Sequence, residues 1–61
     1  MNPNETAKTW LEKALECVQK ANGITERFLS YHPDYEYVRR DLNRLETRIV
    51  EAMNDIDDLG P

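Results

Sequence analysis

The sequence predicts an all-α protein, an antiparallel helical hairpin that dimerises into a four-helix bundle. The main observation lies in residues 35–59, where apolar side chains recur at alternating steps of three and four. These are Tyr35, Val38, Leu42, Leu45, Ile49, Ala52, Ile56 and Leu59. Such heptad spacing puts them on one stripe of an α-helix, and a partner must cover that stripe.

A helix is also predicted before this one, from about residue 3 to about residue 30. Asn2 suits its N-cap, and Pro3 suits its first position. Its apolar residues form a wide stripe with two bands: Ala7, Leu11, Ala14, Val18 and Ala21, and beside them Trp10, Cys17, Ile24 and Tyr31. A stripe of this width can contact two neighbouring helices.

The dipeptide Asn22-Gly23 allows an alternative fold, because Asn-Gly is a strong turn signal. A break there would give a three-helix bundle. The apolar spacing continues through it to Ile24, Phe28 and Tyr31, which favours one uninterrupted helix.

Residues 31–33 predict the turn, since Pro33 keeps the residue before it out of the helical region. The following helix is expected over about 34–57, antiparallel to the first because the connection is short. We expect its last turn to fray, since Asp55, Asp57 and Asp58 oppose the helix dipole. The whole chain, 1–61, forms a single domain.

Two helices that share one seam bury little apolar surface, so a chain of this size is expected to complete its core by self-association. A different protein could cover the stripe instead. The residues expected at the interface are Trp10, Leu11, Ala14, Val18, Ile24, Leu42, Leu45, Ile49, Val50 and Met53.

Composition favours a soluble cytoplasmic protein that is not an enzyme. The net charge is −4, the single Cys17 has no internal partner, and the first residues lack the pattern of a signal peptide. We find no apolar run long enough for a membrane span, no metal-binding spacing, no cofactor motif and no catalytic constellation. Interaction with another protein is therefore the expected function.

An arginine row offers a second function, the binding of nucleic acid through phosphate contacts. Arg40, Arg44 and Arg48 follow one another at steps of four, with Arg39 beside them. Glu36 precedes Arg40 by four positions and Asp41 precedes Arg44 by three, spacings at which ion pairs form along a helix, and this favours a solvated face instead. The chain resembles the RNA-binding plasmid regulator Rop in length and expected architecture; it shares no motif with it, so no residue role carries over.

Aromatic residues gather around the turn: Phe28, Tyr31, His32, Tyr35 and Tyr37. They could close the end of the bundle as a hydrophobic plug, or form a patch that binds a partner. Phe28 and Tyr35 lie on the stripes and are expected in the core. Tyr37 lies off its stripe and is the better candidate for partner contact.

Overall fold

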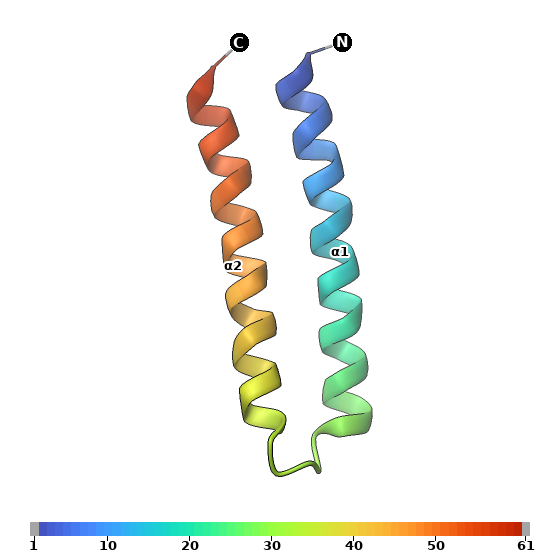
Figure 1. Ribbon diagram of the computed structural model, residues 1–61. Coiled ribbons are helices and arrows are strands. Elements are labelled where there is room, and N and C mark those ends of the chain that lie inside the picture. Colours follow the sequence, from blue (N-terminus) through green and yellow to red (C-terminus); the bar gives the residue numbers. More distant parts are fainter. Residues whose placement is uncertain (1, 61) are drawn as a thin grey trace.

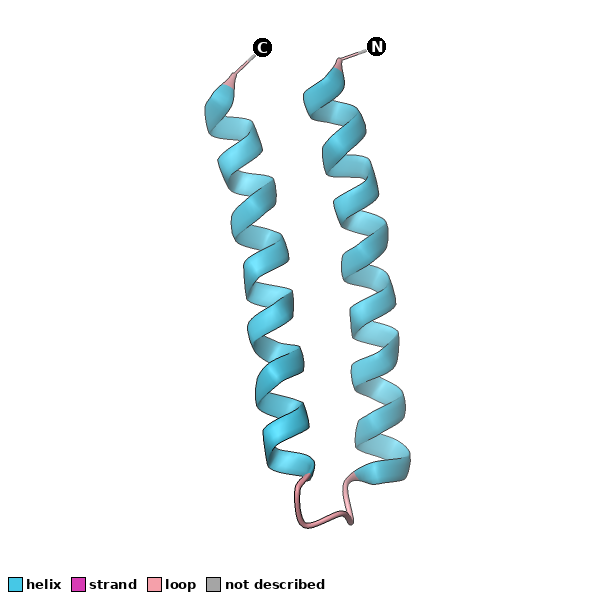
Figure 2. Ribbon diagram, in the orientation of Figure 1, coloured by secondary structure: helices cyan, strands magenta, loops and turns pink. Residues whose placement is uncertain are grey.

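The computed structural model describes residues 2–60, which form two long helices and no strand. Helix α1 (Pro3–Leu29) and helix α2 (Tyr35–Leu59) lie side by side and run in opposite directions (Figure 1). Loop is confined to the turn and the chain ends (Figure 2). The Cα trace of the hairpin extends over 46 × 16 × 8 Å. The predicted all-α hairpin is confirmed; Met1 and Pro61, the ends of the predicted domain, lie outside the described residues.

The start of α1 follows the prediction. Asn2 has an extended backbone, and its side-chain oxygen accepts a hydrogen bond from the Asn4 backbone N–H at 2.9 Å. Pro3 occupies the first helical position, where its missing N–H leaves no bond unmade. Asn2 is therefore the N-cap of α1.

Helix α1 continues without a break through Gly23, so the three-helix alternative is wrong. The Asn22 amide reaches across to α2, where it donates to Asn43 Oδ1 and Glu46 Oε1, each at 3.3 Å. The Asn22 side chain thus forms hydrogen bonds with the neighbouring helix and does not take part in a turn. An interior glycine costs only about 1 kcal/mol, which packing along a whole helix can offset.

The turn is longer than predicted and spans residues 30–34, because α1 ends at Leu29 and α2 begins at Tyr35. Within it, the His32 ring nitrogen Nδ1 accepts a hydrogen bond from the Asp34 N–H at 3.1 Å, and the Tyr35 N–H donates to the His32 carbonyl at 3.0 Å. Pro33 consequently lies in the turn and not in the first position of α2.

Helix α2 extends to Leu59, two residues beyond the predicted end, and the expected fraying of its last turn is not seen. Lys8 of α1 supplies the missing positive charge, since its ammonium contacts Asp57. Gly60 then ends the helix with a φ of 73°, a conformation that favours glycine, and its N–H donates to the Asp57 carbonyl at 3.2 Å.

The two helices meet along one seam, whose residues recur mostly at steps of four and three. On α1 they are Asn4, Lys8, Leu11, Leu15, Val18, Asn22 and Thr25; on α2 they are Tyr35, Leu42, Glu46, Ile49, Met53 and Ile56, followed by Gly60 directly after the helix. Tyr35, at 9% exposure, is buried, and the others are half-buried. The seam is a thin core with water on both sides.

Candidate functional site

One side of the hairpin carries a continuous band of exposed apolar side chains, here called the apolar face. On α1 it consists of Ala7, Trp10, Ala14, Cys17, Ala21, Ile24 and Phe28, with Tyr31 of the turn continuing the row; on α2 it consists of Val38, Leu45, Ala52 and Leu59. Residues seven apart share one side of a helix, and each row flanks the seam of its own helix. Because the helices are antiparallel, the two rows fall on the same side of the hairpin.

The large side chains of the apolar face are open to solvent. Trp10 is 64% exposed, Ile24 and Phe28 are each 59% exposed, and Leu45 is 46% exposed. Ala14 and Ala52 are half-buried and lie level with each other, where the two rows meet. No charged residue interrupts the face, whereas a third of the whole chain is charged. Contiguous exposed apolar surfaces are typical of interaction sites, so the apolar face is the candidate functional site of the hairpin.

The opposite side, here called the polar face, is built from the rows Glu5, Glu12, Gln19 and Glu26 on α1 and Glu36, Asn43, Val50 and Asp57 on α2. Its two rows lie beside each other across the seam: the seam residue Asn22 donates a hydrogen bond to Asn43, and Gln19 and Val50 line one shallow hollow together. The hairpin is therefore amphipathic as a unit, apolar on one side and acidic on the other.

The residues predicted at the interface separate into three groups. Leu11, Val18, Leu42, Ile49 and Met53 lie in the seam between α1 and α2. Trp10, Ala14, Ile24 and Leu45 lie on the apolar face. Val50, 43% exposed, lies on the polar face beside Gln19, and so apart from Leu45.

Sequence reasoning missed part of the seam. The predicted stripe does not contain Leu15, and the polar members Asn4, Lys8, Asn22 and Glu46 carry no hydrophobic signal. The signal that could identify them is spacing: the α1 members lie at regular steps from Leu11, and Glu46 lies at regular steps from Leu42 and Ile49. The apolar heptad of α2 predicts one seam, but the structure divides its residues between two sides of the helix. Tyr35, Leu42, Ile49 and Ile56 face α1, and the other four form the α2 row of the apolar face.

The aromatic residues near the turn also divide. Tyr35 is buried as predicted, whereas Phe28, expected in the core, is exposed because its row lies beside the seam and not within it. Tyr31 is 81% exposed on the apolar face, and Tyr37 is 65% exposed on the outer side of α2. These side chains do not form a closed plug in the hairpin.

The arginines do not share one side of α2. Arg40 and Arg44 lie on its outer side, Arg48 lies in the row beside the apolar face, and Arg39 lies seven positions before the seam residue Glu46. Arg39 differs from the rest: its guanidinium pairs with Glu36 at 2.8 Å, and this hydrogen bond holds the pKa of Arg39 above its ordinary value. The expected partner of Glu36 was Arg40, one position further along the chain. Within residues 2–60, no ion pair engages Arg40, Arg44 or Arg48.

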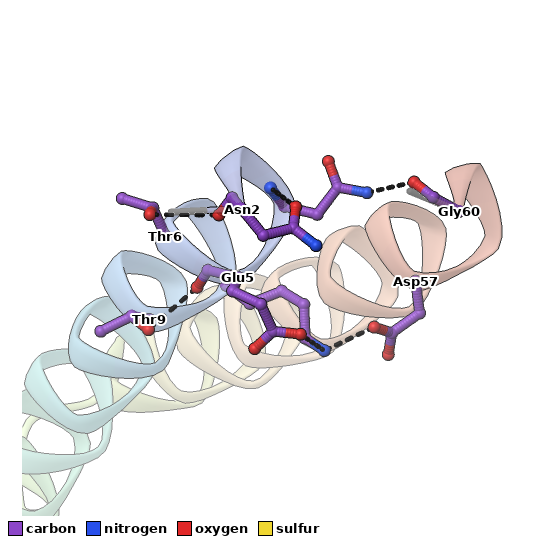
Figure 3. Close-up of polar contacts among 8 residues, drawn as sticks. Asn2, Glu5, Thr6, Thr9, Asp57 and Gly60 are labelled. Atoms are coloured by element: carbon purple, nitrogen blue, oxygen red, sulfur yellow. Dashed lines mark hydrogen bonds and ion pairs between the residues drawn. The ribbon is translucent and has the colours of Figure 1, made fainter.

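The open end of the hairpin is closed by polar contacts (Figure 3). The Asn4 amide donates to the Gly60 carbonyl, and the Lys8 ammonium contacts Asp57 and, at 3.9 Å, Glu5. The hydrogen bond to Asp57 is the main reason that the pKa of Lys8 lies above 10.5, with partial burial opposing it and nearby carboxylates adding to it. These contacts fix the register of α1 against α2.

The surface offers little concavity. Three shallow hollows have volumes of about 190 to 290 Å³, near or below the lower limit of ordinary ligand sites. The one beside the turn is lined by Leu29, His32, Asp34, Tyr35 and Val38. Among the described residues, no group of side chains is placed to hold a metal ion. Neither described helix is long and apolar enough to cross a membrane.

The main surface features of the hairpin are thus the apolar face, the acidic polar face and the polar contacts that join the helices at the open end. Comparison with known protein families, curated proteins and solved structures finds no match to this chain.

Proposed function

We propose that this chain is a non-enzymatic helical protein that acts through protein–protein interaction, as a homodimer serving as a small cytoplasmic regulator or adaptor. The apolar face is the observation that carries this proposal. It runs along both helices, contains no charge, and leaves Trp10, Ile24 and Phe28 mostly exposed in a single hairpin. A second copy brings an identical face, so two hairpins can cover each other in a four-helix bundle.

The surface area of the hairpin supports the same assembly. A single chain exposes 4961 Å², whereas a globular protein of 7.2 kDa exposes about 4,100 Å². The excess of roughly 850 Å² per chain is close to the ~800 Å² that each partner contributes to a stable protein–protein interface. In a dimer, each hairpin would therefore bury about as much surface as its excess exposed area.

The cytoplasmic assignment is supported by the exposed thiol of Cys17 on the apolar face. A free thiol persists in a reducing compartment, where it can pack as a small apolar residue. The shallow, open hollows and the thin core favour a binding surface over a catalytic pocket.

Sedimentation equilibrium over a range of concentrations tests the proposal with two matched variants. Leu45→Asp places a charge on the apolar face, and Val50→Asp places one on the polar face. The two sites are similarly exposed, Leu45 at 46% and Val50 at 43%. We expect dimers for the wild type and Val50→Asp. Leu45→Asp should be monomeric and should lose helix, because it would bury an unpaired charge in the assembly.

A wild-type chain that stays monomeric and still melts cooperatively at high dilution would contradict the proposal. So would a Leu45→Asp variant that dimerises as tightly as Val50→Asp. A wild-type chain that aggregates or remains partly unfolded when purified alone would point to a different protein as the partner.

A further inference from the structure

The two long edges of the apolar face carry opposite charge. Beyond the α1 rows lie Lys13, Lys20 and Arg27, spaced seven apart, with Thr6 completing the row. Beyond the α2 row lie Asp34, Asp41, Arg48 and Asp55, also spaced seven apart. The α1 edge is therefore basic, and the α2 edge is acidic except at Arg48.

Two symmetric arrangements can bury the apolar faces of two hairpins against each other. In the first, the twofold axis runs along the bundle, both turns lie at the same end, and α1 packs beside α2 of the partner. In the second, the axis crosses the bundle, the turns lie at opposite ends, and each helix packs beside its own copy. Burial of apolar area does not distinguish them, but charge does.

The height of each edge residue along the hairpin follows from contacts across the seam. Asn4 meets Gly60, Lys8 meets Asp57, and Asn22 meets Asn43. In each of these pairs the two residue numbers add up to about 65. A residue of α1 therefore lies at the same height as the α2 residue that completes this sum. Long side chains can also reach residues one helical turn above or below that height. A twofold axis along the bundle preserves these heights in the partner.

With both turns at one end, unlike charges meet. Arg27 and Lys20 then flank Asp41 of the second copy, and Lys13 lies within one turn of its Asp55. Arg48 is the exception, because it falls near Lys20. With the turns at opposite ends, like charges meet along both edges. Lys13 lies near Lys20, Asp41 lies near Asp55, and Arg48 lies near its own copy.

We propose that the apolar face binds a second copy of this chain with both turns at the same end, so that α1 packs beside α2 of the partner. This inference rests on the proposed homodimer and adds its orientation. The edge charges select the orientation, and the apolar face supplies the affinity. All four chain ends then lie together at the end opposite the two turns.

Distances between two spin labels measure the orientation directly. The label is attached at Ser30→Cys, an exposed site at the end of α1, in a Cys17→Ser chain that keeps no other thiol. Turns at the same end place the labels less than about 25 Å apart, since neighbouring helices lie 8–10 Å apart. Turns at opposite ends separate them by about 40 Å, the length of a helix of this size at 1.5 Å per residue.

The outcomes of this measurement separate the two proposals. A short distance supports the proposed orientation. A distance of about 40 Å overturns the orientation and leaves the homodimer standing. A labelled chain without any distance between spins, together with a monomeric mass, overturns both.

A charge-reversal series gives an independent test by sedimentation at low ionic strength. Arg27→Glu and Asp41→Lys should each weaken the dimer by about three- to tenfold, the effect expected for exposed pairs that occur twice by symmetry. The double variant should recover most of this loss. Arg40→Glu, a reversal of equal size beside the polar face, serves as the control and should leave the dissociation constant unchanged. A tighter dimer for Asp41→Lys, or no loss in either single variant, would overturn the orientation.

Discussion

The ammonium of Lys8 and the carboxylate of Asp57 are in direct contact although they lie 49 positions apart in the sequence. Their contact joins the first turns of α1 to the last turns of α2, beside the hydrogen bond from Asn4 to Gly60. Lys8 occupies a seam position where an apolar residue would bury more surface. It contributes instead to the register of the two helices and neutralises the acidic end of α2.

The contact between Lys8 and Asp57 should make the hairpin less stable at high pH. Folding raises the pKa of Lys8 above 10.5, so its contribution is fully present below that pH and is lost as the pH rises through the folded value. In Lys8→Met this loss should be absent, because the side chain carries no proton to release. Urea unfolding at about pH 8 and above pH ~10.5 measures the difference. Parallel losses in both chains would show that Lys8 is not responsible.

Replacing Gly23 with alanine should stabilise the hairpin by about 1 kcal/mol, the difference in helix propensity between the two residues. The added methyl group would meet no atom within 4 Å, and the site lies inside α1 on the side away from the apolar face. The midpoint of urea unfolding is the measurement. Gly60→Ala is the contrasting variant, since the φ of 73° at Gly60 disfavours a side chain, and it should give no gain. A lower midpoint for Gly23→Ala would indicate that α1 bends at this position.

Trp10 should report the assembly by its fluorescence. It is the one tryptophan of the chain, and 64% of it is exposed on the apolar face, where the Lys13 ammonium lies 4.6 Å from its ring centre. We expect emission to shift to longer wavelength on dilution, as the dimer dissociates and the ring becomes hydrated. The Leu45→Asp variant is the control and should show one spectrum at every concentration. A wild-type spectrum that stays constant while the mass halves would place Trp10 outside the interface.

The arginine row should not bind nucleic acid. The chain carries a net charge of −4, and the polar face adjoining Arg40 is rich in glutamate, which repels phosphate. A gel-shift titration with RNA and DNA at low ionic strength should show no complex, and Arg44→Glu should leave both that result and the dimer unchanged. A complex that weakens steeply with salt and disappears in Arg44→Glu would establish nucleic-acid binding instead.

The fold was predictable because local signals agreed with each other. Asn2 and Pro3 fixed the start of α1, Pro33 interrupted the helical spacing, and the heptad of α2 had no competing period. At Asn22-Gly23 the turn signal conflicted with the apolar spacing, and the spacing, which continues to Ile24 and Phe28, predicted the uninterrupted helix correctly. The hydrogen bonds from the Asn22 amide to α2 could not be predicted, because no local propensity contains that information.

The division of apolar residues between seam and surface was harder to predict. The heptads of both helices offered two neighbouring rows, and sequence spacing alone does not say which row faces the partner helix. In the structure the seam also contains polar residues, since Lys8 pairs with Asp57 and Asn22 pairs with Glu46. Leu45 and Phe28 lie outside this seam and stay exposed. A search for apolar residues alone does not find a seam that is partly polar.

The hydrogen bond between Asn4 and Gly60 also bears on how the two helices can be connected. It brings two points near opposite ends of the chain into contact, so a short flexible peptide can join the ends into a ring without disturbing either helix. Closing the ring restricts the unfolded chain and should raise the unfolding temperature. The ring can then be reopened within residues 30–34 to give a permuted chain in which α2 precedes α1. Because the seam holds the hairpin together, α2 can precede α1 along the chain without loss of the fold.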